Sequence, residues 1–305
     1  TGGAGFIGSN TAEYLLASGH EVRIFDDLSS GKLANLSGLD VDFIKGDIRR
    51  PEKLSAAMKG CDAVLHLAAL VSVPESVRSP RMSHDINATG TFNVLSAARE
   101  AGVRRVVSAS SAAVYGNLPG SPKKESMSLR AESPYAAGKL SVEHYSSVFS
   151  SVYGLETVCL RYFNVFGPRQ NAASQYSGVI SRFSAALSAG EPLTVFGDGG
   201  QTRDFVYVAD VARANTLALT AAKAGKGEAV NIASGRSVSL LSLAGAMGTV
   251  LGKAPRILFR PAREGDIRRS LADISFARRL LGYRPAYGLE QGLGLTLSAA
   301  LKKRR

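Results

Sequence analysis

Short apolar runs alternate with helix-like stretches throughout the first half of this chain. Five runs predict strands, at residues 21–25, 41–44, 63–67, 105–108 and 157–162. The stretches between them have the amphipathic pattern of helices, at residues 10–18, 51–59, 87–101 and 135–153. Strands that are apolar along nearly their whole length are buried on both faces, which is typical of a parallel sheet. The alternation therefore predicts an α/β fold with a doubly wound parallel sheet.

The second half of the chain is less regular. Its sequence predicts a loop at residues 168–178, a helix at 179–189, a short strand at 193–196 and a glycine-rich turn at 197–202. Residues 230–233 predict a strand that returns to the main sheet, and the chain from about Val238 onward predicts a smaller, helix-rich part. Irregularity of this kind after a regular α/β unit indicates a second domain.

The 305 residues are enough for one large domain or two closely packed ones. We expect the larger domain at residues 1–166, with about 205–235 returning to it, and the smaller one at 167–204 and 236–305. The numbering opens at Thr1, already inside a glycine-rich loop. Because a strand normally leads into such a loop, we expect one to precede Thr1.

Composition restricts the classes of function. The net charge of +12 indicates either a solvated basic surface or attraction for anionic ligands. Nucleic-acid binding is the weaker interpretation, because the sequence lacks a nucleic-acid motif. No run of about 18 apolar residues predicts a membrane span. Cys61 and Cys159 lie in apolar surroundings without the spacing of a metal site, so we expect no metal, and buried free thiols in the reducing cytoplasm.

The chain begins with Thr1-Gly2-Gly3-Ala4-Gly5-Phe6-Ile7-Gly8. Glycines at these spacings permit a tight turn, and they let a pyrophosphate approach the backbone at the N-terminus of a helix. Asp26 ends the next predicted strand about 18 residues later, near the spacing of an acid that binds a ribose hydroxyl. A carboxylate there repels a 2′-phosphate. The pattern therefore predicts a Rossmann-type sheet that binds NAD rather than NADP, with a polar turn at Asp26-Asp27 as the alternative.

Three further side chains suggest chemistry. Tyr135 and Lys139 are four residues apart on a predicted helix and share a face. A lysine cation beside a phenol lowers the pKa of the phenol, which allows the phenol to act as a base. Ser111 follows a predicted strand, where its hydroxyl reaches the ligand crevice of a parallel sheet. We interpret Tyr135 as the base, Lys139 as the group that tunes it and Ser111 as the partner of a substrate hydroxyl. Taken singly, the spacing of Tyr135 and Lys139 is a weak signal whose alternative is an exposed helix pair, and the segment of Ser111 alone favours a solvated loop.

In their order and spacing these motifs resemble the extended short-chain dehydrogenases/reductases. Further matches, over essentially the whole chain, are Gly46-Asp47-Ile48, His66-Leu67-Ala68-Ala69, Asn87-Ala88-Thr89-Gly90-Thr91 and Arg161-Tyr162-Phe163-Asn164-Val165-Phe166-Gly167-Pro168. The resemblance implies that Asp47 and Ile48 flank the adenine and that Phe163 lies near the nicotinamide. The full set of implied NAD-binding residues is Gly2, Gly5, Phe6, Ile7, Gly8, Asp26, Asp27, Leu28, Ser29, Ser30, Gly31, Asp47, Ile48, Leu67, Ala68, Ala69, Asn87, Tyr135, Lys139 and Phe163.

The C-terminal part resembles nucleotide-sugar enzymes of the UDP-glucose 4-epimerase type. The matching stretches are residues 193–197, 201–205 and 263–266. The resemblance implies uracil contacts by the first stretch, diphosphate contacts by Asn164, Arg203 and Arg263, and a ribose contact by Asp266. Guanidinium groups suit phosphate oxygens, although a single arginine is more often a surface residue. The full implied substrate set is Ser111, Asn164, Gly178, Val179, Thr194, Val195, Phe196, Arg203, Arg263, Asp266 and Ser270.

Residues Ala112 and Ala113 distinguish between the reactions of this scaffold. The resembling 4,6-dehydratases carry an Asp-Glu pair there, and UDP-glucuronate decarboxylases carry a glutamate at the position of Ala113. Without these acids, the remaining reaction returns the hydride to the opposite face of a 4-keto sugar. We therefore expect NAD-dependent C4 epimerisation of a UDP-hexose. The alternatives are another NAD-dependent nucleotide-sugar enzyme (a 4,6-dehydratase, decarboxylase or reductase) and a non-catalytic NAD-binding homologue.

Ser270 bears on the size of the substrate. Relatives restricted to UDP-glucose and UDP-galactose carry a tyrosine at this position, whereas relatives that accept N-acetylated sugars carry a small residue. A tyrosine would clash with an N-acetyl group as the sugar turns over. We expect UDP-GlcNAc and UDP-GalNAc as substrates, with UDP-Glc and UDP-Gal tolerated; the alternative is a small surface residue. The resemblance also implies a homodimer through the helices around residues 87–101 and 135–153.

Overall fold

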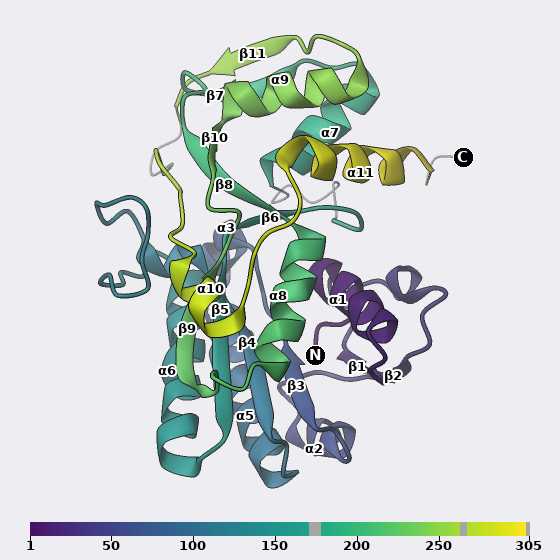
Figure 1. The fold of residues 1–305 in the computed structure, drawn as a ribbon, viewed down its shortest axis with the longest axis vertical. Helices are drawn as coiled ribbons and strands as arrows, with labels where there is room; N and C mark the ends of the chain where they lie inside the picture. Colours follow the sequence, from purple (N-terminus) through teal and green to yellow (C-terminus); the bar gives the residue numbers. More distant parts are fainter. Residues whose placement is uncertain (171–177, 263–266, 303–305) are drawn as a thin grey trace.

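A parallel sheet of four strands organises the lower part of the molecule in Figure 1, a computed structural model that describes residues 1–170, 178–262 and 267–302. Its order is β3 (Ala63–His66), β4 (Arg105–Ser111), β5 (Glu156–Tyr162) and β9 (Lys226–Ile232). A parallel pair, β1 (Arg23–Asp26) and β2 (Asp42–Lys45), lies beside β3. The backbone of the first two residues joins the two sheets, because the Gly2 N–H donates to Phe25 O (3.0 Å) and the Leu67 N–H donates to Thr1 O (3.1 Å).

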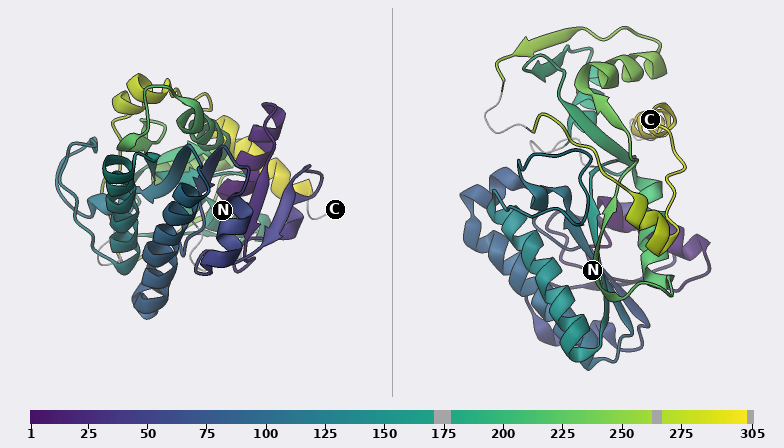
Figure 2. Two further views of the ribbon diagram at one scale, coloured as in Figure 1. Left: turned by 90° about the horizontal axis from the view of Figure 1, so that it is seen from below. Right: turned by 60° about the vertical axis from the view of Figure 1, so that its left-hand side comes forward.

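Helices cover both faces of this parallel sheet. One face packs against α1 (Phe6–Ala17), α8 (Val208–Thr220) and α10 (Ser275–Leu281), around buried side chains such as Val158 and Val211. The other packs against α2 (Pro51–Met58), α5 (Gly90–Glu100) and α6 (Pro134–Tyr153), around Val106 and Leu95. The right-hand view of Figure 2 shows α5 and α6 side by side on the outside of the sheet. The prediction of a doubly wound, Rossmann-type fold is confirmed.

All five strands predicted in the first half are present, with ends shifted by at most three residues. The first helix begins earlier than predicted, at Phe6, directly after the glycine loop. The helix predicted at 87–101 starts with a π-helical segment, Asp85–Thr89, and continues as α5. Short helical segments fill the remaining connections: Leu33–Leu36, α3 (Val73–Arg78), α4 (Pro80–His84) and Ala112–Tyr115. Of the loop predicted at 168–178, residues 171–177 lie outside the described residues.

The upper part of Figure 1 contains two small sheets. In one, β8 (Thr202–Tyr207) pairs with β10 (Ser237–Ser239) and β6 (Asn164–Phe166). In the other, β7 (Leu193–Phe196) pairs with β11 (Ile257–Arg260). Helices α7 (Val179–Ala189), α9 (Leu240–Leu251) and α11 (Leu289–Lys302) surround an apolar cluster beside these sheets. The predicted helix 179–189 and strand 193–196 are confirmed.

Besides α8, two further segments of the second half join the parallel sheet or pack on it. The returning strand predicted at 230–233 is present as β9, which pairs with β5. Helix α10 also lies there, because Ala277 and Leu281 pack beside β9 and the Tyr283 hydroxyl donates to Ala233 O (2.9 Å). The helix-rich part after Val238 is therefore not one continuous cap. The domain boundaries given above stay a prediction.

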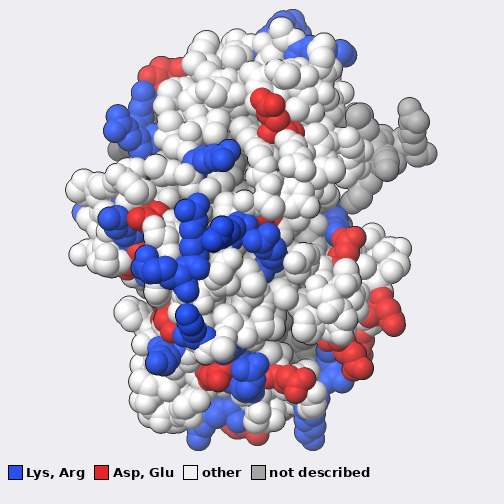
Figure 3. Space-filling model, in the orientation of Figure 1, with Lys and Arg blue, Asp and Glu red and all other residues white. Residues whose placement is uncertain are grey.

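The surface carries a concentration of basic side chains (Figure 3), and both cysteines are free. Figure 3 shows lysines and arginines gathered across the middle of one face, at the level of α10, which carries Arg278 and Arg279. Within the described ranges, no helix is long and apolar enough to cross a membrane. Cys61 and Cys159 are free thiols, as predicted, but only Cys159 is buried.

Candidate active site

The glycine loop packs directly on the end of β3. A Cβ atom on Gly2, whose φ is +72°, would lie 2.5 Å from Ala68 N, and one on Gly8 would lie 2.2 Å from Gly2 O. Both positions therefore exclude any side chain. A Cβ on Gly5 would meet only Gly2 O among the described atoms, at 3.2 Å, so the outer side of Gly5 is open. Among described residues, α1 has no side-chain cap and no acid in its first turn, which leaves the N–H groups of Phe6 and Ile7 to an anion.

Asp26 holds this loop from the end of β1. Its buried carboxylate accepts hydrogen bonds from Ala4 N (2.9 Å) and Leu28 N (2.8 Å). A carboxylate has about four acceptor sites, so it keeps capacity for a ribose hydroxyl. Asp27 accepts from the backbone and hydroxyl of Ser29, and the loop continues through Ser30 and Gly31. The glycine loop is suited to the pyrophosphate of NAD, and Asp26 is suited to its ribose.

The other predicted cofactor residues lie at strand ends along the same edge. Asp47 follows β2 and pairs with Arg49 (2.6 Å), whose hydrogen bonds lower the pKa of Asp47, while Ile48 is buried. Leu67, Ala68 and Ala69 follow β3. Asn87 exchanges two hydrogen bonds with the backbone of Leu70 (2.9 and 3.0 Å), and it packs against Gly138 of α6. Asn87 thus joins the cofactor-side loop to the helix that carries Tyr135.

Ser111, Tyr135 and Lys139 come together at the carboxyl end of β4. Tyr135 is buried in the first turn of α6, and Ser111, the last residue of β4, lies close enough for its side chain to affect the pKa of Tyr135. The Lys139 ammonium lies 5.9 Å from the centre of the Tyr135 ring and donates to Ala109 O (2.7 Å). Phe163, directly after β5, is buried with its ring 6.4 Å from that of Tyr115. The arrangement unites a phenol, a hydroxyl and a cation where a parallel sheet binds ligands.

The pKa of Tyr135 differs from the sequence-based expectation. Burial raises the pKa of Tyr135, and the side chain of Ser111 opposes this rise only in part. Burial also lowers the pKa of Lys139 to about 8. The expected lowering of the pKa of Tyr135 by Lys139 is not seen, because the one group that opposes the effect of burial is Ser111. A second positive charge beside the phenol is needed before Tyr135 acts as a base near neutral pH.

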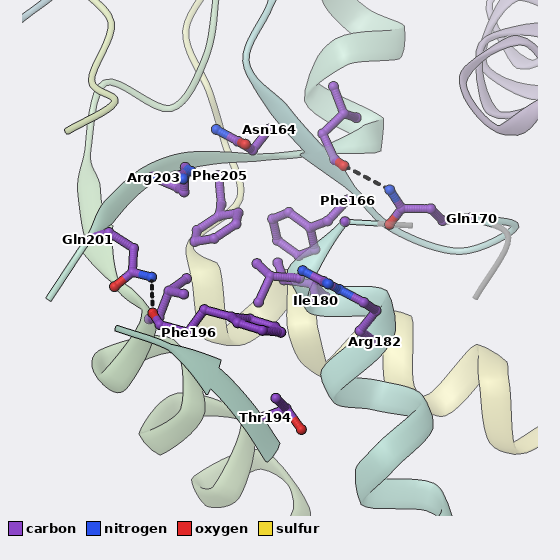
Figure 4. A pocket seen from close by; sticks show the side chains of 14 residues that line it. Asn164, Phe166, Gln170, Ile180, Arg182, Thr194, Phe196, Gln201, Arg203 and Phe205 are labelled. Carbon is purple, nitrogen blue, oxygen red and sulfur yellow. Dashed lines mark hydrogen bonds between the residues drawn. The ribbon is translucent and has the colours of Figure 1, made fainter. Parts of the chain in front are cut away.

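A cavity of about 340 Å³ lies between β6, α7, β7 and β8 (Figure 4). Six predicted substrate residues line it: Asn164, Gly178, Val179, Thr194, Phe196 and Arg203. The other lining residues were not among the predicted substrate residues; they are Val165, Phe166, Gln170, Ile180, Arg182, Gln201, Phe205 and Leu240. Strand alternation is the signal that was available for Phe205, because it shares a face of β8 with Arg203. Aromatic rings and two arginines make this cavity suitable for an anionic aromatic ligand.

The remaining predicted residues differ in their placement. Val195 is fully buried in the apolar cluster, pointing away from Thr194 and Phe196, so any ligand contact would come from its backbone. Ser270 is half-buried and donates its N–H to Thr202 O (3.1 Å). Two residues later, Ala272 packs in the cluster that contains Phe163. Arg263 and Asp266 lie outside the described residues.

Residues 1–233 match the model of the NAD dependent epimerase/dehydratase family. The chain belongs to this family. It is 40% identical to a UDP-glucose 4-epimerase of Mycolicibacterium smegmatis, over 97% of this chain and 96% of that protein. The predicted resemblance to the extended short-chain dehydrogenases/reductases, the enzyme class and the NAD cofactor are confirmed.

Two solved structures are similar over nearly their full length. One is a UDP-N-acetylglucosamine 4-epimerase of Methanobrevibacter ruminantium in complex with UDP-N-acetylmuramic acid (38% identity, TM-score 0.94, 99% of this chain and 97% of that one). The other is a UDP-glucose 4-epimerase of Thermus thermophilus in complex with NAD (38% identity, TM-score 0.89, 98% and 96%). Their similarity extends beyond the cofactor-binding sheet to the part that forms the cavity.

The glycine loop gives the first testable prediction. Gly8→Ala should destabilise the protein by about 1–3 kcal/mol and weaken NAD binding at least about tenfold, because its Cβ would collide with Gly2 O. Gly245→Ala is the matched control, since Gly245 is exposed in α9 with open space around it. This control should gain about 0.5–1 kcal/mol and bind NAD normally. Thermal unfolding and calorimetry measure both. Equal NAD affinity in the two variants would contradict the role of the loop.

Proposed function

We propose that this enzyme epimerises a UDP-sugar at C4 through a transient 4-keto intermediate. The observation that carries the proposal is the meeting of Ser111, Tyr135 and Lys139 at the sheet edge that also bears the glycine loop and Asp26. Whole-chain similarity to proteins named as 4-epimerases supports it. The residues assigned to catalysis, cofactor and substrate are part of this proposal.

Tyr135, Ser111 and Lys139 each have a separate role in the proposed reaction. NAD held by the glycine loop and Asp26 would supply the acceptor and later the donor of a hydride, and the positive charge of its oxidised ring would favour ionisation of the buried phenol. Tyr135 takes the proton of the C4 hydroxyl and returns it after the keto-sugar has turned over. Ser111 bonds to the same hydroxyl and orients it toward Tyr135. Lys139, with a pKa of about 8, is mainly charged at neutral pH and adds to the positive potential around Tyr135.

The alternatives fit these residues less well. Elimination of water and decarboxylation both need an acid next to the strand end that bears Ser111. Here the turn that follows β4 begins with Ala112 and Ala113, whose methyl groups donate no proton. A non-catalytic homologue would have no need to bury a tyrosine and a lysine together, because burial of both disfavours their charged forms. Epimerisation uses only the groups that are present.

The cavity is the proposed site of the UDP moiety. Phe196, Phe166 and Phe205 supply apolar faces for the base, and Figure 4 shows their rings around one space. Arg203 supplies positive charge for the diphosphate, together with Asn164. We propose Arg263 as a further diphosphate ligand and Asp266 as a ribose ligand. We also propose that the chain works in the cytoplasm, where its two thiols stay reduced.

Tyr135 provides the decisive test of this function. Tyr135→Phe removes only the ionisable oxygen, so kcat for interconversion of UDP-sugars should fall by about 10² to 10⁴-fold. Binding of NAD and UDP-sugar should stay nearly intact in calorimetry. Tyr162→Phe is the control, because Tyr162 is a buried tyrosine whose hydroxyl donates to Asn215 on the α8 side of the sheet. A Tyr135→Phe enzyme within a few-fold of the parent would remove Tyr135 from the mechanism.

We propose UDP-GlcNAc and UDP-GalNAc as the preferred substrates. Ser270 supports this, because its small side chain lies on the segment that reaches the Phe163 cluster through Ala272. Ser270→Tyr should therefore suppress turnover of the N-acetylated pair by at least about tenfold while sparing UDP-galactose, since the added ring fills space that only the acetyl group needs. Steady-state kinetics on both pairs in one preparation serve as the internal control. A parent enzyme that converts UDP-galactose rapidly and UDP-GlcNAc not at all would refute the preference but leave epimerisation standing.

A homodimer is the proposed assembly. Five apolar side chains of α5 and α6 are between 39% and 65% exposed: Phe92, Tyr145, Val148, Val152 and Tyr153. The rings of Phe92 and Tyr145 meet edge to face across these helices (5.4 Å), which makes one continuous patch. Two copies of this patch would form a symmetric interface of four helices.

Introducing charged residues into this patch by mutation tests the proposed dimer. Val148→Glu with Val152→Glu should convert the dimer to a monomer in light scattering, because two carboxylates per subunit would be buried at the interface. Phe259→Glu, an exposed apolar position on β11, should leave the assembly unchanged. A parent protein that is monomeric at micromolar concentration would contradict the proposal.

A further inference from the structure

A buried ion pair lies beneath the catalytic strand end. Arg161 of β5 donates from Nε to Glu143 Oε1 and from Nη2 to Glu143 Oε2, both at 2.8 Å. Their side chains are only 4% and 9% exposed. Removing two charges from water is costly even when they are paired, and apolar residues often serve stability equally well. A pair kept at such a place is therefore a candidate for fixing one particular geometry.

The pair joins the two elements that carry the catalytic side chains. Ser110 donates to Glu143 Oε1 (2.5 Å), and it immediately precedes Ser111 on β4. Glu143 lies one helical turn beyond Lys139 on α6, the helix that begins with Tyr135. The Ser110–Glu143 bond is thus a direct link between the strand of Ser111 and the helix of Tyr135.

A second arm of the network runs toward the segment of Ser270. Arg161 also donates to the Tyr115 hydroxyl (2.8 Å), which donates to Asn231 Oδ1 (2.8 Å). The Asn231 amide donates to Lys123 O (3.0 Å) and to Asp273 O (3.3 Å). Every member from Ser110 to Asn231 is buried, so solvent does not compete for these bonds.

We propose that the Glu143–Arg161 pair is the positioning element of this active site, holding Ser111 and Tyr135 at the separation that the reaction requires. The inference rests on the proposed role of Tyr135 as base. Neither Glu143 nor Arg161 touches the reacting atoms in this arrangement. Both act through Ser110 and through the backbone of β4 and α6. Displacement by about 1 Å between reacting groups costs on the order of 10²-fold in rate, so a rigid link at this point has a large effect.

Ser110→Ala is the sharpest test, because it cuts the link without unpairing a buried charge. We expect kcat to fall about 10-fold to 10²-fold with KM for the UDP-sugar changed less than about twofold. Ser108→Ala is the matched control: Ser108 is on the same strand, two residues earlier, and its buried hydroxyl has no hydrogen-bond partner among the described residues. The control should keep the kcat of the parent. Equal kcat in the two variants would overturn the proposal.

A double-mutant cycle separates positioning from general loosening. In a Ser111→Ala background, Ser110→Ala should cost little further kcat, because the group that it positions is already gone. Additive losses would mean that Ser110 acts elsewhere and would overturn the proposal. On the second arm, Tyr115→Phe should also lower kcat, whereas Tyr162→Phe, which removes an equally buried hydroxyl on the opposite face, should not.

Hydrogen-exchange measurements distinguish a failure of the positioning role from a failure of the proposed epimerase function. Amides of residues 110–115 and 135–143 should exchange faster in Ser110→Ala than in Ser108→Ala, whatever the substrate. If the parent epimerises no UDP-sugar, the proposed function fails, and unchanged exchange in Ser110→Ala would separately refute the positioning role. If the parent is active but Ser110→Ala matches Ser108→Ala in both rate and exchange, only the positioning role fails.

Discussion

The contact between the glycine loop and the end of β3 is the constraint on which the remaining structure depends. Backbone meets backbone there, since neither Gly2 nor Gly8 has room for a Cβ atom. This close approach joins β1 to β3, starts α1 at Phe6 and turns the first N–H groups of that helix toward the edge where the strands of the main parallel sheet end. The same loop hydrogen-bonds to Asp26 through Ala4. The contacts that form the cofactor site are therefore the same contacts that join the strands.

Burial determines which protonation states the side chains of Tyr135 and Lys139 favour. A phenol and an ammonium withdrawn from water both resist their charged forms, and the directions of their pKa shifts show this for Tyr135 and Lys139. The side chain of Ser111 lowers the pKa of Tyr135, and the positive charge of bound NAD would act in the same direction. Dependence of the base on the cofactor is useful in an epimerase, because proton removal is favoured only when a hydride acceptor is in place.

The sequence specified the parts of the fold that repeat and left out those that depend on distant partners. Five strands and the catalytic motifs were predictable, since their periodicity and spacing are local. Strands β6, β8, β10 and β11 were not, because they are short and interrupted by loops, and their hydrogen bonds come from segments far away in the chain. The orientation of Val195 follows from pairing with β11, and the pKa of Tyr135 follows from burial. Neither the orientation of Val195 nor the pKa of Tyr135 can be predicted from a single stretch of residues.

The two faces of the parallel sheet show how stability and function are separated. Toward α8 many of the contacts are apolar, with Val158, Leu160 and Ile232 at their centre, and the buried polar contacts include the bond from Tyr162 to Asn215. Toward α6 the same strands bury Ser110, Arg161 and Glu143 near their carboxyl ends, and the apolar contacts lie farther back along the strands. An apolar face tolerates small shifts between strand and helix, whereas a network of directed hydrogen bonds allows one arrangement. The face toward α6 is the one that bears Ser111 and Tyr135, so this network of directed hydrogen bonds lies where the proposed reaction tolerates little displacement.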